Sequence, residues 1–413
     1  MGNRKPTYLD LFAGAGGLSE GFQRLGYIDI AHVEMNQNAC ETLKTRVAYH
    51  YLKERDNLDF YYKYLKEEID RDELYSAVPK CLLDSVINHT ISSETLDKLY
   101  NDIDLIKKEK KIRKIDLIIG GPPCQAYSLV GRARSDDGMA SDPRNHLYLR
   151  YCEIIEHYRP KMFVFENVQG LYSAGNGHYY ESLKERLDEI GYEVMDHLLK
   201  FDDYGVLQNR KRVILIGWEK GSGRYYPNFK KIEHNYTLSD LLGDLPILTP
   251  GQVGDVYRTS EYSNYLKEFL IRNDKDILTL NSVRTLNEHD AEIYRRVIEA
   301  WNTNGIRLKY TDLPEELWTH NNRNCFLDRF KVVASNLKTA QTIVAHLSKD
   351  GHYFIHPDIR QCRSITVREA ARIQSFPDDY YFEGNRTAQF IQVGNAVPPI
   401  ISEMIARELL KQL

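Results

Sequence analysis

Short apolar runs in the first half of the chain alternate with stretches of helical periodicity. The pattern predicts helices over 18–25, 147–157 and 179–190. Strands are predicted over 7–12, 28–33, 115–119, 162–165, 193–199 and 212–217. Strands that alternate with helices indicate an α/β fold built on a doubly wound, mostly parallel sheet.

The alternation breaks in two places. Residues 45–100 are rich in Tyr, Lys and Asp with only patches of helical periodicity, which indicates an insertion. From 218 to 345 the alternation of strands and helices is lost, and this change of pattern predicts a second, smaller domain. An amphipathic helix over 400–413 can return to the first domain. The predicted domains are 1–217 plus 388–413, with the insertion 45–100, and 218–387.

Composition narrows the class of protein. The chain has 413 residues, 42% of them hydrophobic and 28% charged, as in globular domains. It has no apolar run of about 18 residues and no signal-peptide core, so we expect a cytoplasmic protein with no membrane partner. A net charge of −4 means that a nucleic-acid site would need basic residues gathered on one face. Six scattered cysteines without a CxxC pair favour neither disulfides nor a metal site.

Ligands of an open parallel sheet bind beyond the carboxyl ends of its strands. A glycine loop follows the first strand, with Gly14 and Gly16 but Ser19 where a dinucleotide loop has its third glycine. Glu34 ends the next strand and suits ribose hydroxyls. The pair favours a nucleoside cofactor without a pyrophosphate. A tight turn beside a surface glutamate is the alternative.

Two reactive side chains also follow predicted strands. Cys124 stands behind Pro122 and Pro123, where the backbone is stiff, and an arginine-rich segment follows it. This setting favours a nucleophile over a buried structural cysteine. Glu166 ends a very apolar strand, which makes its carboxyl easier to protonate. A proton donor beside a thiolate suggests attack on an electron-poor ring, although an exposed glutamate or a helix cap is the alternative for Glu166.

A third group of side chains precedes the strand predicted at 212–217. Strand alternation would place Gln208, Arg210 and Arg212 on one side of the chain. Aimed at the site, they could hold a base carbonyl and neighbouring phosphates. A solvated basic edge is the alternative.

Together these motifs resemble the DNA (cytosine-5) methyltransferases that use S-adenosylmethionine. The resemblance follows the family's order and spans 8–40, 101–217 and 363–399. The matching segments are Asp10-Leu-Phe-Ala-Gly-Ala-Gly-Gly17, Glu34-Met35, Pro122-Pro-Cys-Gln125, Glu166-Asn-Val168, Gln208-x-Arg-x-Arg212, Arg368-Glu-Ala-Ala-Arg-Ile-Gln-Ser-Phe-Pro377 and Gly394-Asn395.

The resemblance implies a Rossmann-like catalytic domain, a target-recognition domain over 218–387 and roles for single residues. Cys124 would add to C6 of a flipped-out cytosine, Glu166 would protonate or hydrogen-bond N3, and Arg212 would hold O2, with Arg210 in the same motif. The implied cofactor contacts are Phe12, Ala13, Gly14, Gly16, Gly17, Leu18, Glu34, Met35, Asp102, Ile103, Pro123, Asn395 and Val397. The implied DNA contacts are Gln125, Ser128, Arg132, Arg144, Gln208 and Thr342.

The expected function is therefore sequence-specific methylation of double-stranded DNA by a monomer. Its expected context is a restriction-modification system with a cognate restriction endonuclease. A relative that methylates tRNA and a catalytically silent DNA-binding relative are the alternatives. An NAD-dependent oxidoreductase is disfavoured by Ser19.

Overall fold

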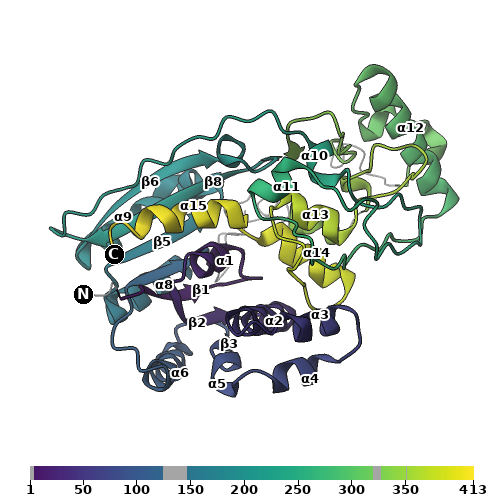
Figure 1. Ribbon diagram of the computed structural model, residues 1–413. Helices are drawn as coiled ribbons and strands as arrows, with labels where there is room; N and C mark the ends of the chain where they lie inside the picture. The colour runs from purple at the N-terminus through teal and green to yellow at the C-terminus, as the bar shows by residue number, and fades with distance from the viewer. Residues whose placement is uncertain (1–3, 124–146, 320–326, 350) are drawn as a thin grey trace.

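A seven-stranded sheet forms the centre of the chain (Figure 1). The computed structural model describes residues 4–123, 147–319, 327–349 and 351–413. The strand order is β3-β2-β1-β4-β5-β8-β6. The strands are β1 (Thr7–Leu11), β2 (Ile28–Glu34), β3 (Val86–Asn88), β4 (Leu117–Gly120), β5 (Met162–Asn167), β6 (Tyr192–Lys200) and β8 (Lys211–Glu219). Neighbouring strands from β3 to β5 pair in parallel and β8 runs antiparallel to β5 and β6, so the predicted mostly parallel sheet is confirmed.

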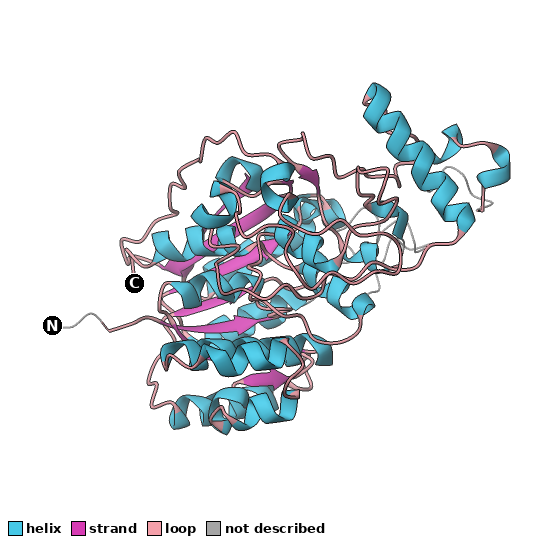
Figure 2. Ribbon diagram, turned by 45° about the vertical axis from the view of Figure 1, so that its right-hand side comes forward, coloured by secondary structure: helices cyan, strands magenta, loops and turns pink. Residues whose placement is uncertain are grey.

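Helices cover both faces of this sheet (Figure 2). On one face, α1 (Gly17–Arg24) and α15 (Pro399–Leu409) pack against each other and over Tyr8 of β1. The C-terminal helix therefore returns to the first part of the chain, as predicted. On the other face, α6 (Leu96–Glu109), α8 (Leu147–Tyr158) and α9 (His178–Glu189) cover Leu9 and Leu11. Strand residues alternate between the two cores because successive side chains point to opposite faces.

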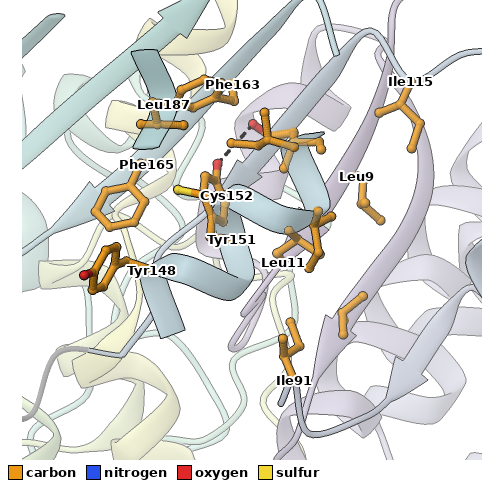
Figure 3. Close-up of a cluster of buried hydrophobic side chains, with 14 of the residues drawn as sticks. Leu9, Leu11, Ile91, Ile115, Tyr148, Tyr151, Cys152, Phe163, Phe165 and Leu187 are labelled. Carbon is orange, nitrogen blue, oxygen red and sulfur yellow. Dashed lines mark hydrogen bonds between the residues drawn. The ribbon is translucent and has the colours of Figure 1, made fainter. Parts of the chain in front are cut away.

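Figure 3 shows the core beneath α8. Leu11 of β1 and Phe163 and Phe165 of β5 surround Tyr151 and Cys152 of that helix. The hydroxyl of Tyr151 donates to the carbonyl of Val164 at 2.8 Å, which satisfies a polar atom in a fully buried site. This packing fixes β4 and β5 side by side, and the carboxyl ends of both strands reach the candidate site.

The predicted insertion of residues 45–100 includes elements that belong to the fold itself. Helix α2 runs without a break over Gln37–Glu54, and β3 (Val86–Asn88) is an integral edge strand paired with β2. Three residues are too few to show strand alternation, which is why the sequence pattern missed β3. Only α3 (Leu58–Leu65), α4 (Arg71–Ser76) and α5 (Lys80–Leu83) stand between those two elements.

Most of the second half of the chain is loop with short helices, and the longer α12 stands apart at one end of the molecule (Figure 1). Its α-helices and strands are α10 (Leu238–Leu242), α11 (Asn264–Glu268), α12 (Glu288–Asn304), α13 (Val367–Ile373), α14 (Arg386–Asn395), and the pair β7 (Gln208–Asn209) and β9 (Ala340–Gln341). Short 3-10 helices lie at Gln169–Tyr172, Ala174–Gly177, Phe201–Tyr204, Tyr310–Asp312, Glu315–Leu317, Ala345–Ser348 and Gly351–Tyr353. No helix in the described ranges is long and apolar enough to cross a membrane.

The two halves share a core. Ala15 and Leu207 pack in the same buried cluster as residues of α13 and α14. Buried ion pairs add to the contact: the Arg46 guanidinium lies 2.6 Å from Glu20 of α1 and 2.9 Å from Asp379. Because packing is continuous here, the boundary at 218–387 stays a prediction.

Candidate active site

The glycine loop is a tight turn at the carboxyl end of β1. Phe12, Gly14 and Gly16 have φ angles of 56°, 56° and 80°, in the left-handed region that favours glycine. The Ala13 amide donates to the carbonyl of Val33 at 3.0 Å, which ties the turn to the end of β2. A Cβ on Gly17 would collide with the carbonyl oxygen of Val397. The loop therefore closes against the segment after α14, and it brings the predicted cofactor residues of both segments together.

Glu34, the last residue of β2, holds this turn in place. Its Oε2 accepts from the amide of Gly14 and its Oε1 from the amide of Asn36, both at 2.8 Å. Burial raises the pKa of the Glu34 carboxyl, although these two amide bonds act in the opposite direction. The next side chain, Met35, is 63% exposed. A carboxylate beside an exposed apolar side chain suits a nucleoside: the ribose hydroxyls would bind Glu34 and the base would lie on Met35.

The far side of the loop is formed by the end of α14. Asn395 is exposed there, whereas Val397 is buried. A Cβ on Gly394 would collide with the backbone of Val344 and Ala345. Only glycine therefore lets the end of α14 pack this closely against that segment.

Asp102 and Ile103, the predicted cofactor contacts, do not lie at a strand end. Both residues lie within α6, and Ile103 is fully buried in the core between that helix and the sheet. Asp102 was predicted from its spacing to Cys124, and this spacing could not reveal that the strand in question, β3, lies earlier in the sequence. The strand end beside Glu34 is instead formed by Asn88 and His89.

These two residues were missed by the sequence analysis. The Asn88 amide donates to the carbonyl of Met35 at 3.0 Å, and the His89 backbone amide donates to that of Glu34 at 2.9 Å. The apolar pair Val86-Ile87 followed by polar residues was the available signal, and it is a weak one.

The turn that leads into Cys124 lies against Glu166. A Cβ on Gly121 would lie 2.9 Å from Oε2 of Glu166, so the backbone and the carboxylate are in close approach. The side-chain amide of Asn167 donates to the carbonyl of Pro122 at 3.4 Å. The predicted nucleophile Cys124 lies outside the described residues, as do the predicted DNA contacts Gln125, Ser128, Arg132 and Arg144. Pro123, the last described residue before them, is exposed.

Glu166 and Arg212 form an ion pair at this turn. The Nε of Arg212 lies 3.0 Å from Oε1 of Glu166, and the two side chains are 15% and 12% exposed. They come from the adjacent antiparallel strands β5 and β8. An Nη of Arg212 also donates to the carbonyl of Lys211 at 2.8 Å. The structure therefore brings two of the predicted catalytic residues together, and each keeps a small exposed fraction.

Gln208 and Arg210 require correction, because neither can contact DNA or substrate. Gln208 is fully buried, donates to the carbonyl of Ile373 at 3.1 Å and accepts from the amide of Ile343 at 2.8 Å. Arg210 is 1% exposed and donates to the carbonyls of Ile343, at 2.8 Å, and Ala396, at 3.1 Å.

The side chains of Gln208 and Arg210 point into the interior, and the prediction failed because residues 208–212 do not form one strand. This segment is the short β7, paired with β9, followed by β8, so strand alternation does not hold across it. Burial lowers the pKa of Arg210 well below its usual range. Thr342, a predicted DNA contact, is half-buried beside β9 and donates to the carbonyl of Asn209 at 2.5 Å. Its DNA contact stays a prediction.

Known proteins match this chain over nearly its whole length. The model of the C-5 cytosine-specific DNA methylase family matches residues 7–79 and 84–411. The type II methyltransferase M.Bpa9945I of Bacillus paralicheniformis is 45% identical, with 97% of each chain covered. The type II methyltransferase M1.HphI of Haemophilus parahaemolyticus is 30% identical over 98% of this chain and 87% of its own.

A solved structure shares the fold. It is the crystal structure of a prophage-encoded protein of E. coli named a putative DNA modification methyltransferase, with a TM-score of 0.64 and 22% identity over 98% of this chain and 99% of that one. On the strength of these sequence matches, this chain belongs to the C-5 cytosine-specific DNA methylase family, as a DNA (cytosine-5) methyltransferase of the type II restriction-modification kind.

Proposed function

We propose that the enzyme transfers a methyl group from S-adenosylmethionine to C5 of a cytosine within one short sequence of double-stranded DNA. The observation that carries this proposal is the Glu166–Arg212 ion pair, 3.0 Å long, beside the turn that leads into Cys124. A proton-donating carboxyl, a guanidinium and a thiol are the groups that activation of a cytosine ring needs.

The residues around the glycine loop fit S-adenosylmethionine. Each oxygen of the Glu34 carboxylate accepts one hydrogen bond from a backbone amide. Each can accept a further hydrogen bond from a ribose hydroxyl. Met35 is exposed beside it, and Ser19 stands where a pyrophosphate-binding loop would have its third glycine. When bound, S-adenosylmethionine supplies the methyl group that the activated C5 accepts.

The chemistry at the ring follows from the need to make C5 nucleophilic. The Cys124 thiolate forms a bond to C6, Glu166 gives a proton or a hydrogen bond to N3, and Arg212 holds O2. C5 is then able to accept the methyl group. Loss of the C5 proton and elimination of Cys124 restore the ring and the enzyme. The cytosine must first leave the duplex stack, because its C6 cannot be reached inside it.

The proposal includes the enzyme's context. We expect a monomer on DNA, in the cytoplasm, with a cognate restriction endonuclease of the same target sequence. Methylation of tRNA is the second candidate. The 45% identity to a type II methyltransferase over almost the full chain favours DNA.

Bisulfite sequencing tests the activity and the target together. We would express the chain in cells that lack cytosine methylation, together with Cys124→Ser and, as a matched control, Cys81→Ser, whose cysteine is exposed on α5. Unconverted cytosines in one recurring short sequence are expected for the wild type and the Cys81 variant and not for the Cys124 variant. Fully converted DNA from all of them would overturn the DNA assignment, and labelled methyl transfer to tRNA would then be measured.

A further inference from the structure

Helix α3, in the segment between α2 and β3, contributes no residue to the site described above. It lies beside α2 (Figure 1). The buried side chains of α3 and α4 form a cluster with Ala48, Tyr49 and Leu52 of α2. Within the described residues, no strand contributes to this cluster. Helix α3 therefore packs on α2, and covering the sheet is not its role in the fold.

Two tyrosines of α3 bind the segment 379–383, which follows α13. Tyr61 is fully buried, and its hydroxyl donates to the carbonyl oxygen of Asp379 at 2.8 Å. The hydroxyl of Tyr64 donates to Oε1 of Glu383 at 2.7 Å. Helix α3 is thus attached to both ends of this segment, although more than 300 positions of sequence separate them.

Helix α2 binds the same segment, but mainly through a side chain. The Arg46 guanidinium lies 2.9 Å from Oδ1 of Asp379, and the Tyr49 hydroxyl donates to Oδ2 at 2.5 Å. Arg46 also donates to the carbonyl oxygen of Asp379, at 3.4 Å, so Tyr61 makes the shorter bond to this backbone group. The position of the Asp379 backbone therefore depends on α3 as well as on α2.

The backbone of Asp379 leads directly into Tyr380, which contacts the glycine loop. The Tyr380 hydroxyl donates to the carbonyl oxygen of Ala15. The Tyr380 ring is buried, with its centroid 4.8 Å from that of Phe376 and 5.2 Å from that of Phe382. Because a close-packed interior transmits small displacements, a shift of the Asp379 backbone would also shift the hydroxyl that meets the loop.

We propose that α3 positions the glycine loop for the cofactor, with Tyr61 as the positioning residue. By holding the carbonyl of Asp379, Tyr61 sets where the Tyr380 hydroxyl meets Ala15. This inference rests on the proposed function, since the loop is the site assigned there to S-adenosylmethionine. If Tyr61 served stability alone, loss of its hydroxyl would lower the melting temperature and leave cofactor affinity unchanged.

Calorimetry of S-adenosylmethionine binding to the full chain tests this role. The test variant is Tyr61→Phe, which keeps the ring and loses the bond to Asp379. The matched control is Tyr62→Phe on the same helix, because Tyr62 is 9% exposed and its hydroxyl makes no hydrogen bond to a described residue. We expect Tyr61→Phe to bind the cofactor about 3-fold more weakly, with a nearly unchanged kcat at saturating cofactor. Tyr62→Phe should bind it like the wild type.

A double-mutant cycle shows whether Tyr61 acts through Tyr380. Tyr380→Phe removes the hydroxyl that meets Ala15, so the position of Asp379 should then matter little to the loop. The double variant Tyr61→Phe/Tyr380→Phe should bind the cofactor about as tightly as Tyr380→Phe alone, whereas independent effects would multiply. Multiplied effects would overturn the inference.

Thermal unfolding of each variant separates positioning from stability. Wild-type cofactor affinity in Tyr61→Phe, with or without a lower melting temperature, would make Tyr61 a structural residue and overturn the inference. An equal loss of affinity in Tyr62→Phe would overturn it too, because it indicates general loosening of α3. In these cases the wild type still binds S-adenosylmethionine and the proposed function stands. If the wild type does not bind this cofactor, the proposed function fails, and the inference fails with it.

Discussion

The hydroxyl of Tyr380 donates a hydrogen bond to the carbonyl oxygen of Ala15, in the middle of the glycine loop. A Cβ on Gly16 would lie 2.8 Å from the same hydroxyl, so the tyrosine also limits the room for the loop. The guanidinium of Arg46 lies 4.6 Å from the Tyr380 ring and binds Glu20 of α1. The turn that follows α13 thus positions a loop that lies more than 360 residues before it.

Removal of this hydroxyl should weaken cofactor binding more than it slows methyl transfer. In Tyr380→Phe the ring still packs, but one buried hydrogen bond of about 1 kcal/mol is lost and the loop gains freedom. We expect the KM for S-adenosylmethionine to rise about 5-fold with a nearly unchanged kcat. Tyr257→Phe is the control, since its hydroxyl binds Asp378, at 2.8 Å, and not the loop. Equal KM values for the two variants would contradict the positioning role.

The Glu166–Arg212 pair should be needed for chemistry and not for binding. Glu166→Gln keeps the shape of the side chain but removes the transferable proton, so single-turnover methyl transfer should slow by about 100-fold or more. Arg212→Met should have a comparable effect because the base carbonyl loses its donor. Binding of S-adenosylmethionine, measured by calorimetry, should stay within a few-fold of the wild type. A matching loss of cofactor affinity would instead assign the pair to cofactor binding.

Cofactor affinity should depend on pH through Glu34. The pKa of this carboxyl is raised by burial, and its protonated form has lost acceptor capacity. Affinity should therefore rise with pH as the carboxyl ionises and then level off. Glu34→Gln should bind S-adenosylmethionine at least 10-fold more weakly and lose this part of the pH dependence. Glu41→Gln is the control, because Glu41 lies in α2 and pairs with Arg71 at 3.6 Å. Retained affinity in Glu34→Gln would refute the ribose assignment.

Asp276 should make the fold less stable as pH rises. Burial and the charges of Asp379 and Asp378 raise the pKa of Asp276 to about 8. The folded protein therefore holds a proton that the unfolded chain has released above about pH 4. Between these values the free energy of unfolding should fall with rising pH, by at most about 1.4 kcal/mol per pH unit from this group.

Denaturant unfolding at a series of pH values checks this linkage. Asp276→Asn should be more stable than the wild type at pH 8 and should show a flatter profile between pH 5 and 8. The neighbouring Asp274 is exposed, so Asp274→Asn should leave the profile as it is. Parallel profiles for the wild type and Asp276→Asn would show that the carboxyl is ionised in the folded protein.

Much of the site could be predicted because it is built at strand ends. Gly14, Glu34 and Glu166 each follow a short apolar run, and the parallel order of β1, β2, β4 and β5 brings those ends to one edge. The assignment of Asp102 had a different basis. Asp102 fitted the spacing of a motif, yet a three-residue strand had already taken that place in the sheet.

The sequence by itself determined the class of fold and the place of the glycine loop at the end of the first strand, because apolar periodicity and strand ends are local properties; the roles of the reactive side chains stay predictions. Only the tertiary structure decided which polar side chains face the site. Gln208 and Arg210 look like Arg212 in the sequence, but carbonyls of Ile343, Ile373 and Ala396 engage them in the interior. Burial of a polar group depends on partners distant in the chain, and no local pattern contains them.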